Sequence, residues 1–165
     1  MAQTYTSAGT SINSGRLPAV YRRIPVLKNG ILFDLGCGKY TDHIRSAMPG
    51  IEYLPYDPYN QPKDVNRHSV WRLGRAMRKH EPVTVVCSNV LNVIDDDATL
   101  TNIAEFIQRT VQATGGTAYI TVYDGDRSGI GRQTGPDQYQ RNAPLRDYLK
   151  YFRNARIRSG MIVVT

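Results

Sequence analysis

Four residues in the first third of the chain have the types and spacing needed to bind a nucleotide-like ligand. Asp34, Gly36 and Gly38 form an acid followed by two closely spaced glycines. Such glycines can adopt positive φ and let a ligand approach the backbone. Asp57 follows about twenty residues later, where a carboxylate at the tip of the neighbouring strand can accept hydrogen bonds from ribose hydroxyls. A tight turn without a ligand explains the glycine pair equally well, and Asp57 is what favours a ligand site.

The segments around these residues predict alternating strands and helices. Apolar runs over 31–35, 52–56, 83–88 and 117–122 are typical of strands, and the run before Gly36 is apolar enough for burial on both faces. Helical patterns cover 16–27, 41–48, 69–79, 95–114 and 145–152, and 161–164 predicts a closing strand. Asp95, Asp96 and Asp97 are expected to cap a helix that ends at Gly115 and Gly116.

This order predicts an α/β fold of the Rossmann-like, doubly wound type. The expected sheet is mostly parallel, with helices on both faces, in one compact domain over residues 16–165. A chain of 165 residues is long enough for one such core. Residues 1–15 are rich in Thr, Ser, Gly and Ala and predict a flexible N-terminal arm. Segment 124–136 is predicted to be a glycine-rich loop that acts as a substrate lid.

The chain resembles the class I S-adenosylmethionine-dependent methyltransferases, and is closest to small methyltransferase-like proteins of bacteria and phages. Their first motif reads Asp or Glu, x, Gly, x, Gly, which Asp34-Leu-Gly-Cys-Gly38 matches. Asp57 matches their ribose-binding acid, within an Asp-Pro-Tyr sequence that related proteins share. The segment Asn89-Val-Leu-Asn-Val-Ile94 is similar to the one that follows a later strand in these enzymes.

The resemblance implies S-adenosyl-L-methionine as the cofactor and a set of residues around it. These are Asp34, Gly36, Cys37, Gly38, Asp57, Pro58, Asp64, Ser88 and Asn89. Asp64 corresponds to a position near the adenine amino group, with helix capping as its alternative role. Asn89 and Tyr123 are the candidates for a catalytic role beside the methyl acceptor.

Two departures from the family pattern bear on activity. Tyr40 stands where the family often has a small residue, so its ring must turn away from the cofactor or pack along it. Ser88-Asn89-Val90-Leu91 has none of the prolines found in enzymes that methylate amino groups of nucleic-acid bases. The sequence therefore does not identify the acceptor, for which a nucleic acid or a nucleotide is the first candidate.

The chain carries a formal charge of +7, which indicates an acidic partner. Most of its basic residues are arginines, which suit phosphate groups. Nucleic-acid contacts are predicted for Arg72, Arg75, Arg78, Arg132 and Arg141. The first three lie on the amphipathic helix predicted over 69–79, whose basic face could equally be a solvated surface.

Other functional classes find little support in the sequence. Cys37 and Cys87 are predicted to be buried and reduced, and no metal site is predicted because the histidines and cysteines lack ligand spacing. The absence of a long apolar segment predicts a soluble, cytoplasmic protein, in the host cytoplasm if a phage encodes it, with no membrane contact. The oligomeric state is not predicted.

Three functional hypotheses remain open at this point. The first is an S-adenosylmethionine-dependent methyltransferase acting on an unidentified acceptor. The second is a catalytically degenerate accessory protein of a DNA modification or phage system, which binds the cofactor or a nucleic acid. The third is a fold relative that holds a different nucleotide, with Asp57 still contacting the ribose.

Overall fold

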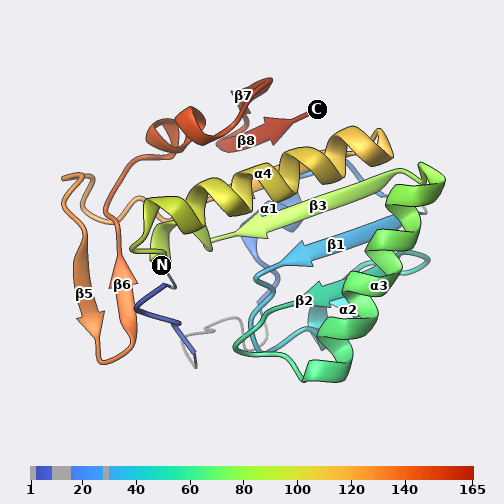
Figure 1. Ribbon diagram of the computed structural model, residues 1–165, viewed down its shortest axis with the longest axis horizontal. Helices are drawn as coiled ribbons and strands as arrows, with labels where there is room; N and C mark the ends of the chain where they lie inside the picture. Colours follow the sequence, from blue (N-terminus) through green and yellow to red (C-terminus); the bar gives the residue numbers. More distant parts are fainter. Residues whose placement is uncertain (1–2, 9–15, 28–29) are drawn as a thin grey trace.

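The computed structural model describes residues 3–8, 16–27 and 30–165, and a six-stranded sheet lies at its centre (Figure 1). Its strands are β1 (Ile31–Leu35), β2 (Glu52–Tyr56), β3 (Val83–Ser88), β4 (Thr117–Thr121), β7 (Ala155–Arg158) and β8 (Met161–Val164). Their order across the sheet is β2-β1-β3-β4-β8-β7. β1 to β4 are parallel, whereas β8 is antiparallel to both of its neighbours. The predicted α/β fold with a mostly parallel sheet is confirmed.

Helices cover both faces of the sheet, as a doubly wound fold requires. One face carries α3 (Lys63–Lys79), α4 (Asp97–Thr114) and the 3₁₀ helix η2 (Leu145–Tyr151), and the other carries α1 (Ala19–Arg23) and α2 (Asp42–Ala47). Successive side chains of β1 pack against opposite helix layers. Phe33 packs in the core that includes Ile107 of α4, and Leu32 packs with Val20 and Ile44 of the opposite layer.

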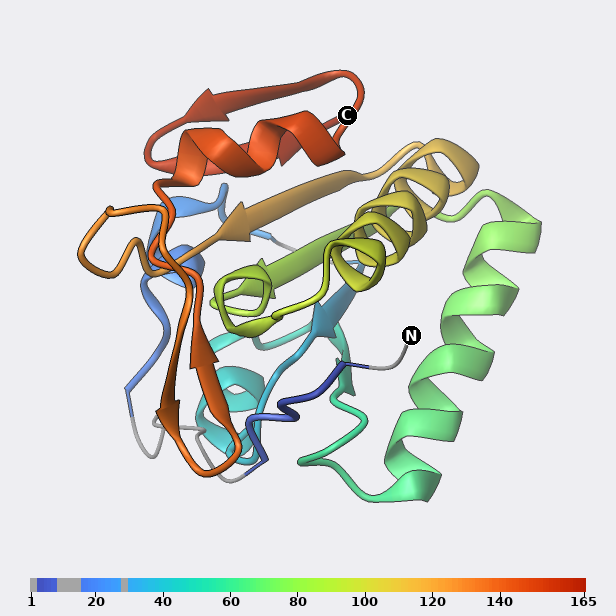
Figure 2. The same cartoon turned by 60° about the vertical axis from the view of Figure 1, so that its left-hand side comes forward.

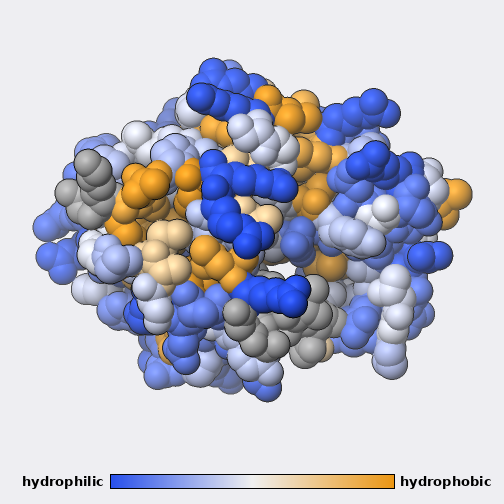
Figure 3. Space-filling model, turned by 180° about the vertical axis from the view of Figure 1, so that it is seen from behind, coloured by the Kyte–Doolittle hydropathy of each residue, from blue (hydrophilic) through white to orange (hydrophobic). Residues whose placement is uncertain are grey.

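The helices of the two layers differ in length. α3 and α4 have 17 and 18 residues, whereas α1 and α2 have five and six. In the layer of the short helices α1 and α2, partly buried apolar side chains complete the packing, namely Leu17, Leu27, Met48, Ile51 and Tyr119. From behind, hydrophobic residues are visible between hydrophilic ones on the surface (Figure 3).

The ends of α4 agree with the prediction made from capping residues. Asp96 is the N-cap, and its Oδ2 accepts a hydrogen bond of 2.7 Å from the Thr99 amide. Gly115 ends the helix with φ of +64°. A Cβ on Gly116 would lie 1.9 Å from the Val83 carbonyl oxygen, so only glycine fits where α4 returns to the sheet.

Other predicted boundaries were wrong. The predicted helix over 16–27 is confined to α1, and α3 begins at Lys63, before the predicted start at residue 69. Contacts with the end of β2 hold the early turns of α3. Asn66 exchanges hydrogen bonds of 2.9 Å with the Asp57 backbone, and the Ser69 hydroxyl donates to the Pro55 carbonyl at 2.6 Å.

The second half of the chain contains strands that were not predicted. Part of the expected loop 124–136 forms β5 (Arg132–Gly135), which pairs with β6 (Gln138–Gln140) as a two-stranded hairpin. β7 was also missed. The hairpin lies beside the carboxyl ends of the central strands, and the Asn92 side chain, just beyond β3, donates to Gln140 at 3.1 Å (Figure 1).

Residues 3–8 of the predicted N-terminal arm lie along this hairpin (Figure 2). The Thr6 amide donates to the Asp137 carboxylate at 2.8 Å, and the Ser7 amide donates to the Asp137 carbonyl at 2.9 Å. The ring of Tyr5 stacks on Tyr139 with a centroid distance of 5.7 Å. The rest of the predicted arm, residues 1, 2 and 9–15, lies outside the described residues, and its flexibility stays a prediction.

None of the helices in the described ranges combines the length and apolar character needed to cross a membrane.

Candidate functional site

The strand order changes direction between β1 and β3, because β2 lies on one side of β1 and β3 on the other. In open α/β sheets, ligands bind outside the carboxyl ends of the strands at such a switch point. Three segments meet this edge: the turn 36–38 after β1, the loop 57–62 after β2 and residues 88–90 at the end of β3. They contain most of the predicted cofactor residues.

The glycine turn is closely tied to the end of β2. Gly36 and Gly38 have φ of +74° and +73°, in the region that favours glycine. The amides of Gly36 and Cys37 donate to the Tyr56 carbonyl at 2.7 and 3.2 Å, and the Gly38 amide donates to Asp57 Oδ2 at 3.0 Å. These amides are therefore already engaged, and they hold the turn against β2.

Gly36 also permits contact with the segment after β3. A Cβ at Gly36 would lie 2.3 Å from Val90 Cγ2. The missing side chain thus lets Val90 pack directly on the turn. The contact between Gly36 and Val90 therefore brings together the Asp34–Gly38 and Asn89–Ile94 segments, which the sequence resemblance had singled out.

Asp57 is buried and binds its own loop. Besides the Gly38 amide, its carboxylate accepts hydrogen bonds of 2.9 Å from the amides of Tyr59 and Asn60. The Asn60 side-chain amide lies 3.3 Å from both carboxylate oxygens. A carboxylate has about four acceptor positions, so a ribose could gain hydrogen bonds here by replacing the Asn60 side chain, whose contacts are the longest.

Asp34 lies beneath the turn and does not open onto it. Its side chain is buried, and Oδ2 accepts a hydrogen bond of 2.6 Å from the Tyr53 hydroxyl. Burial raises the pKa of Asp34 to about 6, against the lowering effect of the Tyr21 and Tyr53 hydroxyls. The negative charge of Asp57 raises this pKa further. Because both tyrosines belong to the layer of α1 and α2, Asp34 braces the turn from that side.

The two cysteines are unsuited to nucleophilic chemistry. Both are buried, and burial raises the pKa of the Cys37 and Cys87 thiols well above the ordinary value. The negative charge of Asp34 acts in the same direction. Both thiols therefore stay protonated at neutral pH. Across 3–8, 16–27 and 30–165, no cluster of His, Cys, Asp and Glu side chains could hold a metal ion.

Ser88 and Asn89 link the switch point to the end of β4. The Thr121 hydroxyl donates to Ser88 Oγ at 3.1 Å, and the Asn89 amide donates to the Thr121 carbonyl at 2.9 Å. Asn89 is exposed and has φ of +57°. Asparagine tolerates this left-handed conformation better than most residues, and strained positions of this kind cluster at functional sites.

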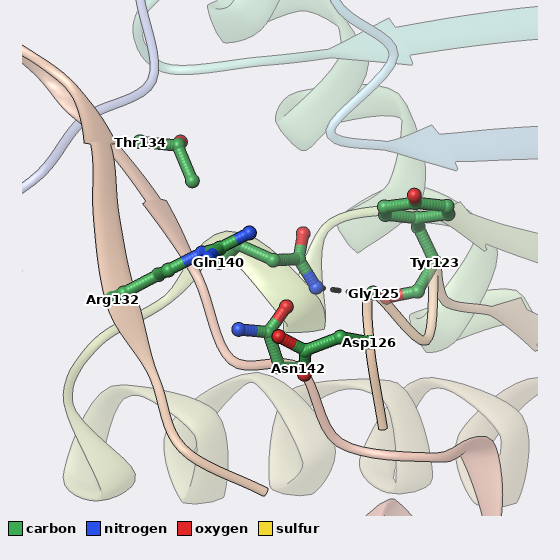
Figure 4. Close-up of a pocket in the computed structure, with 7 residues that line it drawn as sticks. All are labelled: Tyr123, Gly125, Asp126, Arg132, Thr134, Gln140 and Asn142. Carbon is green, nitrogen blue, oxygen red and sulfur yellow. Dashed lines mark hydrogen bonds between the residues drawn. The ribbon is translucent and has the colours of Figure 1, made fainter. Parts of the chain in front are cut away.

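An open pocket of about 410 Å³ lies between the end of β4 and the hairpin (Figure 4). Tyr123, whose side chain is exposed, lines it together with Asp126 and Arg132. Buried amides hold the walls in place: Gln140 donates to the Tyr123 carbonyl and Asn142 donates to the Ile130 carbonyl, both at 2.9 Å. The sequence had indicated Asn142 as a side chain able to hydrogen-bond a base, whereas Gln140 was missed because nothing in its local pattern distinguishes it from a surface residue.

The remaining predicted cofactor residues, Pro58 and Asp64, are exposed to solvent. Asp64 lies in the first turn of α3, where a carboxylate interacts favourably with the positive end of the helix dipole. Tyr40 is 42% exposed, and the Lys39 ammonium lies 5.8 Å from its ring centroid. The Tyr40 ring is therefore partly exposed to solvent and is not enclosed by the turn.

The five predicted nucleic-acid arginines fall into two groups. Arg72 forms ion pairs with Glu52 and Glu81 at 2.8 and 2.7 Å, and Arg141 forms one with Asp97 at 2.6 Å. These two side chains are mostly buried and have structural partners. Arg75, Arg78 and Arg132 are exposed.

The sequence matches no protein-family model, and no curated protein matches it at a significant level.

Proposed function

We propose that this protein binds S-adenosyl-L-methionine at the switch point between β1 and β3 and transfers its methyl group to an acceptor. The observation that carries the proposal is the meeting of three segments. At the carboxyl edge of the sheet, the 36–38 turn is hydrogen-bonded to Asp57 through Gly38 and packs against Val90 through Gly36. These are the segments that match the motifs of the class I methyltransferases.

The residues present fit this cofactor with one side-chain movement. The backbone of 36–38 would support it, and Asp57 would accept hydrogen bonds from the ribose once Asn60 turns aside. Ser88 and Asn89 would line the side toward β4, next to the pocket that Tyr123 borders. The cofactor supplies an electrophilic methyl group on a sulfonium centre.

Such a transfer asks little acid–base chemistry of the protein when the acceptor is already nucleophilic. The residues have to orient the acceptor and exclude water. The pocket that Tyr123 lines is a suitable place for an acceptor, because Thr121, two residues before Tyr123, accepts a hydrogen bond from the Asn89 amide and so connects the two segments. The buried, protonated Cys37 and Cys87 have no part in this scheme.

One observation favours a second candidate, the nonenzymatic accessory protein. The Asp57 carboxylate already accepts three backbone hydrogen bonds within the chain. If these bonds and the Asn60 contacts persist in solution, the carboxylate has no acceptor position for a ribose. In that case Asp57 and the carboxyl edge of the sheet would have a structural role and would not bind the cofactor.

Calorimetric titration with S-adenosylmethionine and with its demethylated product distinguishes the candidates. We expect the folded protein to bind both compounds, and Asp57→Asn to weaken binding about tenfold or more, the effect of losing a charged hydrogen-bond acceptor. Asp147→Asn is the matched control, because it removes one carboxylate charge from an exposed position of η2, outside the predicted cofactor residues. We expect it to change the affinity less than twofold.

Each alternative outcome has a clear meaning when thermal unfolding shows that the variants are folded. No binding of either compound refutes the proposal. Binding that Asp57→Asn leaves unchanged refutes the site. Where binding is found, transfer of a tritiated methyl group to DNA, RNA, nucleotides or protein extract distinguishes an enzyme from a binder.

A further inference from the structure

The outer face of α3 carries a line of basic side chains around an exposed tryptophan. Arg67, Trp71, Arg75 and Arg78 recur at intervals of four, four and three residues, which places them on one side of a helix. The buried residues Ser69, Leu73 and Ala76 lie on the opposite side, against the sheet. In Figures 1 and 2, α3 borders the molecule and no other described element covers its outer side. We call these four residues the α3 stripe.

Trp71 is 54% exposed and is the only tryptophan in the chain. The Arg75 guanidinium lies 5.8 Å from its ring centroid, and the His68 ring lies 6.1 Å away and is tilted. Single exposed apolar residues are common on protein surfaces. A tryptophan between arginines differs from these, because its ring offers a stacking surface next to groups that bind phosphate.

The stripe keeps its positive charge. Among the described residues, Arg67, Arg75 and Arg78 form no ion pair within 4 Å, in contrast to Arg72 on the flank of the helix. Lys63 and Lys79 extend the positive charge at the two ends of α3. The helix has one carboxylate, Asp64, and Glu81 beyond its end is already paired with Arg72. The face is therefore strongly basic.

We propose that the α3 stripe binds single-stranded nucleic acid, with a base stacked on Trp71 and phosphates on Arg67, Arg75 and Arg78. An unpaired base offers the open ring face that stacking needs, whereas a duplex offers its phosphates only. The stripe extends over about 16 Å of helix axis, which is enough for a few nucleotides. A membrane surface would need a wider apolar face than Val70 and Trp71 provide.

Because Trp71 is the only tryptophan, its fluorescence reports on this surface alone. Titration of the full-length protein with a 12-nucleotide oligothymidylate should quench the emission, and the apparent affinity should fall steeply with salt. Trp71→Leu should weaken binding about tenfold, measured by anisotropy of a labelled oligonucleotide.

A matched pair of triple variants tests the assignment. Replacing Arg67, Arg75 and Arg78 by Gln should make the slope of log affinity against log salt shallower by about 2. Replacing Arg153, Arg156 and Arg158 by Gln removes the same charge from exposed positions near β7 and should leave the slope unchanged.

Three results would overturn the proposal: no quenching at low salt, an equal loss of slope in both triple variants, or equally tight binding of a duplex or of vesicles with anionic lipid. Thermal unfolding confirms that each variant is folded. S-adenosylmethionine binding by the same variants is expected to be unchanged, so failure here would leave the proposed methyl transfer untouched.

Discussion

At the scale of single residues, the candidate site depends on carboxylates whose roles differ from their sequence pattern. Asp34 belongs to the glycine motif, yet it is buried beneath the turn and bonded to Tyr53. Asp57 lies at the predicted edge, but it also holds Gly38 and its own loop. The positions of both acids follow from the sequence. Their partners could not be predicted, because Tyr53 and Gly38 are each 19 residues away in the chain.

The raised pKa of Asp34 makes stability depend on pH. Its pKa is about 6 in the folded protein, against an ordinary value of 3.8. The folded state therefore holds the proton more tightly than the unfolded state. The stabilisation is fully present below the ordinary pKa and is lost as pH rises through about 6, by about 3 kcal/mol in total.

Urea unfolding at pH 5 and pH 7.5 measures this effect. We expect the wild type to be less stable at pH 7.5, and Asp34→Asn, which cannot ionise, to lose most of that difference. The pKa values of Asp96 and Asp97 are lowered in the folded protein, so these residues affect stability only at lower pH, as pH falls through the ordinary range of aspartate. Identical pH dependence in the wild type and the variant would show that Asp34 does not carry the effect.

At the scale of elements, local pattern predicted some segments and missed others for physical reasons. β1 to β4 have apolar runs and α4 has a capping aspartate and a terminal glycine, so the signals lie within each segment. The β5–β6 hairpin is polar and depends on distant partners, including the Asn92 side chain and the N-terminal residue Thr6. Contacts of that kind leave no periodic trace in the sequence.

The contact between the glycine turn and the segment after β3 can be tested by adding one methyl group. Gly36→Ala places a Cβ 2.3 Å from Val90 Cγ2 at a φ of +74°. We expect it to lower the free energy of unfolding by about 2 kcal/mol or more, from backbone strain and the clash together. Urea or thermal unfolding provides the measurement.

Gly115→Ala is the matched control for this variant. Its φ is +64°, but no heavy atom lies within 4 Å of the added Cβ, so the expected cost is about 1 kcal/mol from conformation alone. Gly36→Ala combined with Val90→Ala should recover part of the loss. If Gly36→Ala lowers the free energy of unfolding no more than Gly115→Ala does, Val90 does not pack closely against the turn.

At the scale of the whole molecule, the sheet places two surfaces of different chemistry on one small domain. The carboxyl edge gathers the glycine turn, Asp57 and Asn89, and the β5–β6 hairpin closes one side of that edge around an open pocket. The α3 stripe lies on the outer layer, and α3 begins directly after the loop that contains Asp57. The sequence resemblance predicted the first surface, whereas the exposure and ion pairing of individual side chains were needed to define the second.

The most direct test of the central claim is to observe the backbone amides by NMR while S-adenosylmethionine is added. The proposed site predicts the largest changes in the signals of Gly36, Gly38 and Asn89, with the β7–β8 pair unchanged. Loss of the hydrogen bonds between Asn60 and Asp57 should add a change at Asn60. No change in any of these signals at saturating cofactor, or changes confined to another part of the molecule, would contradict the account.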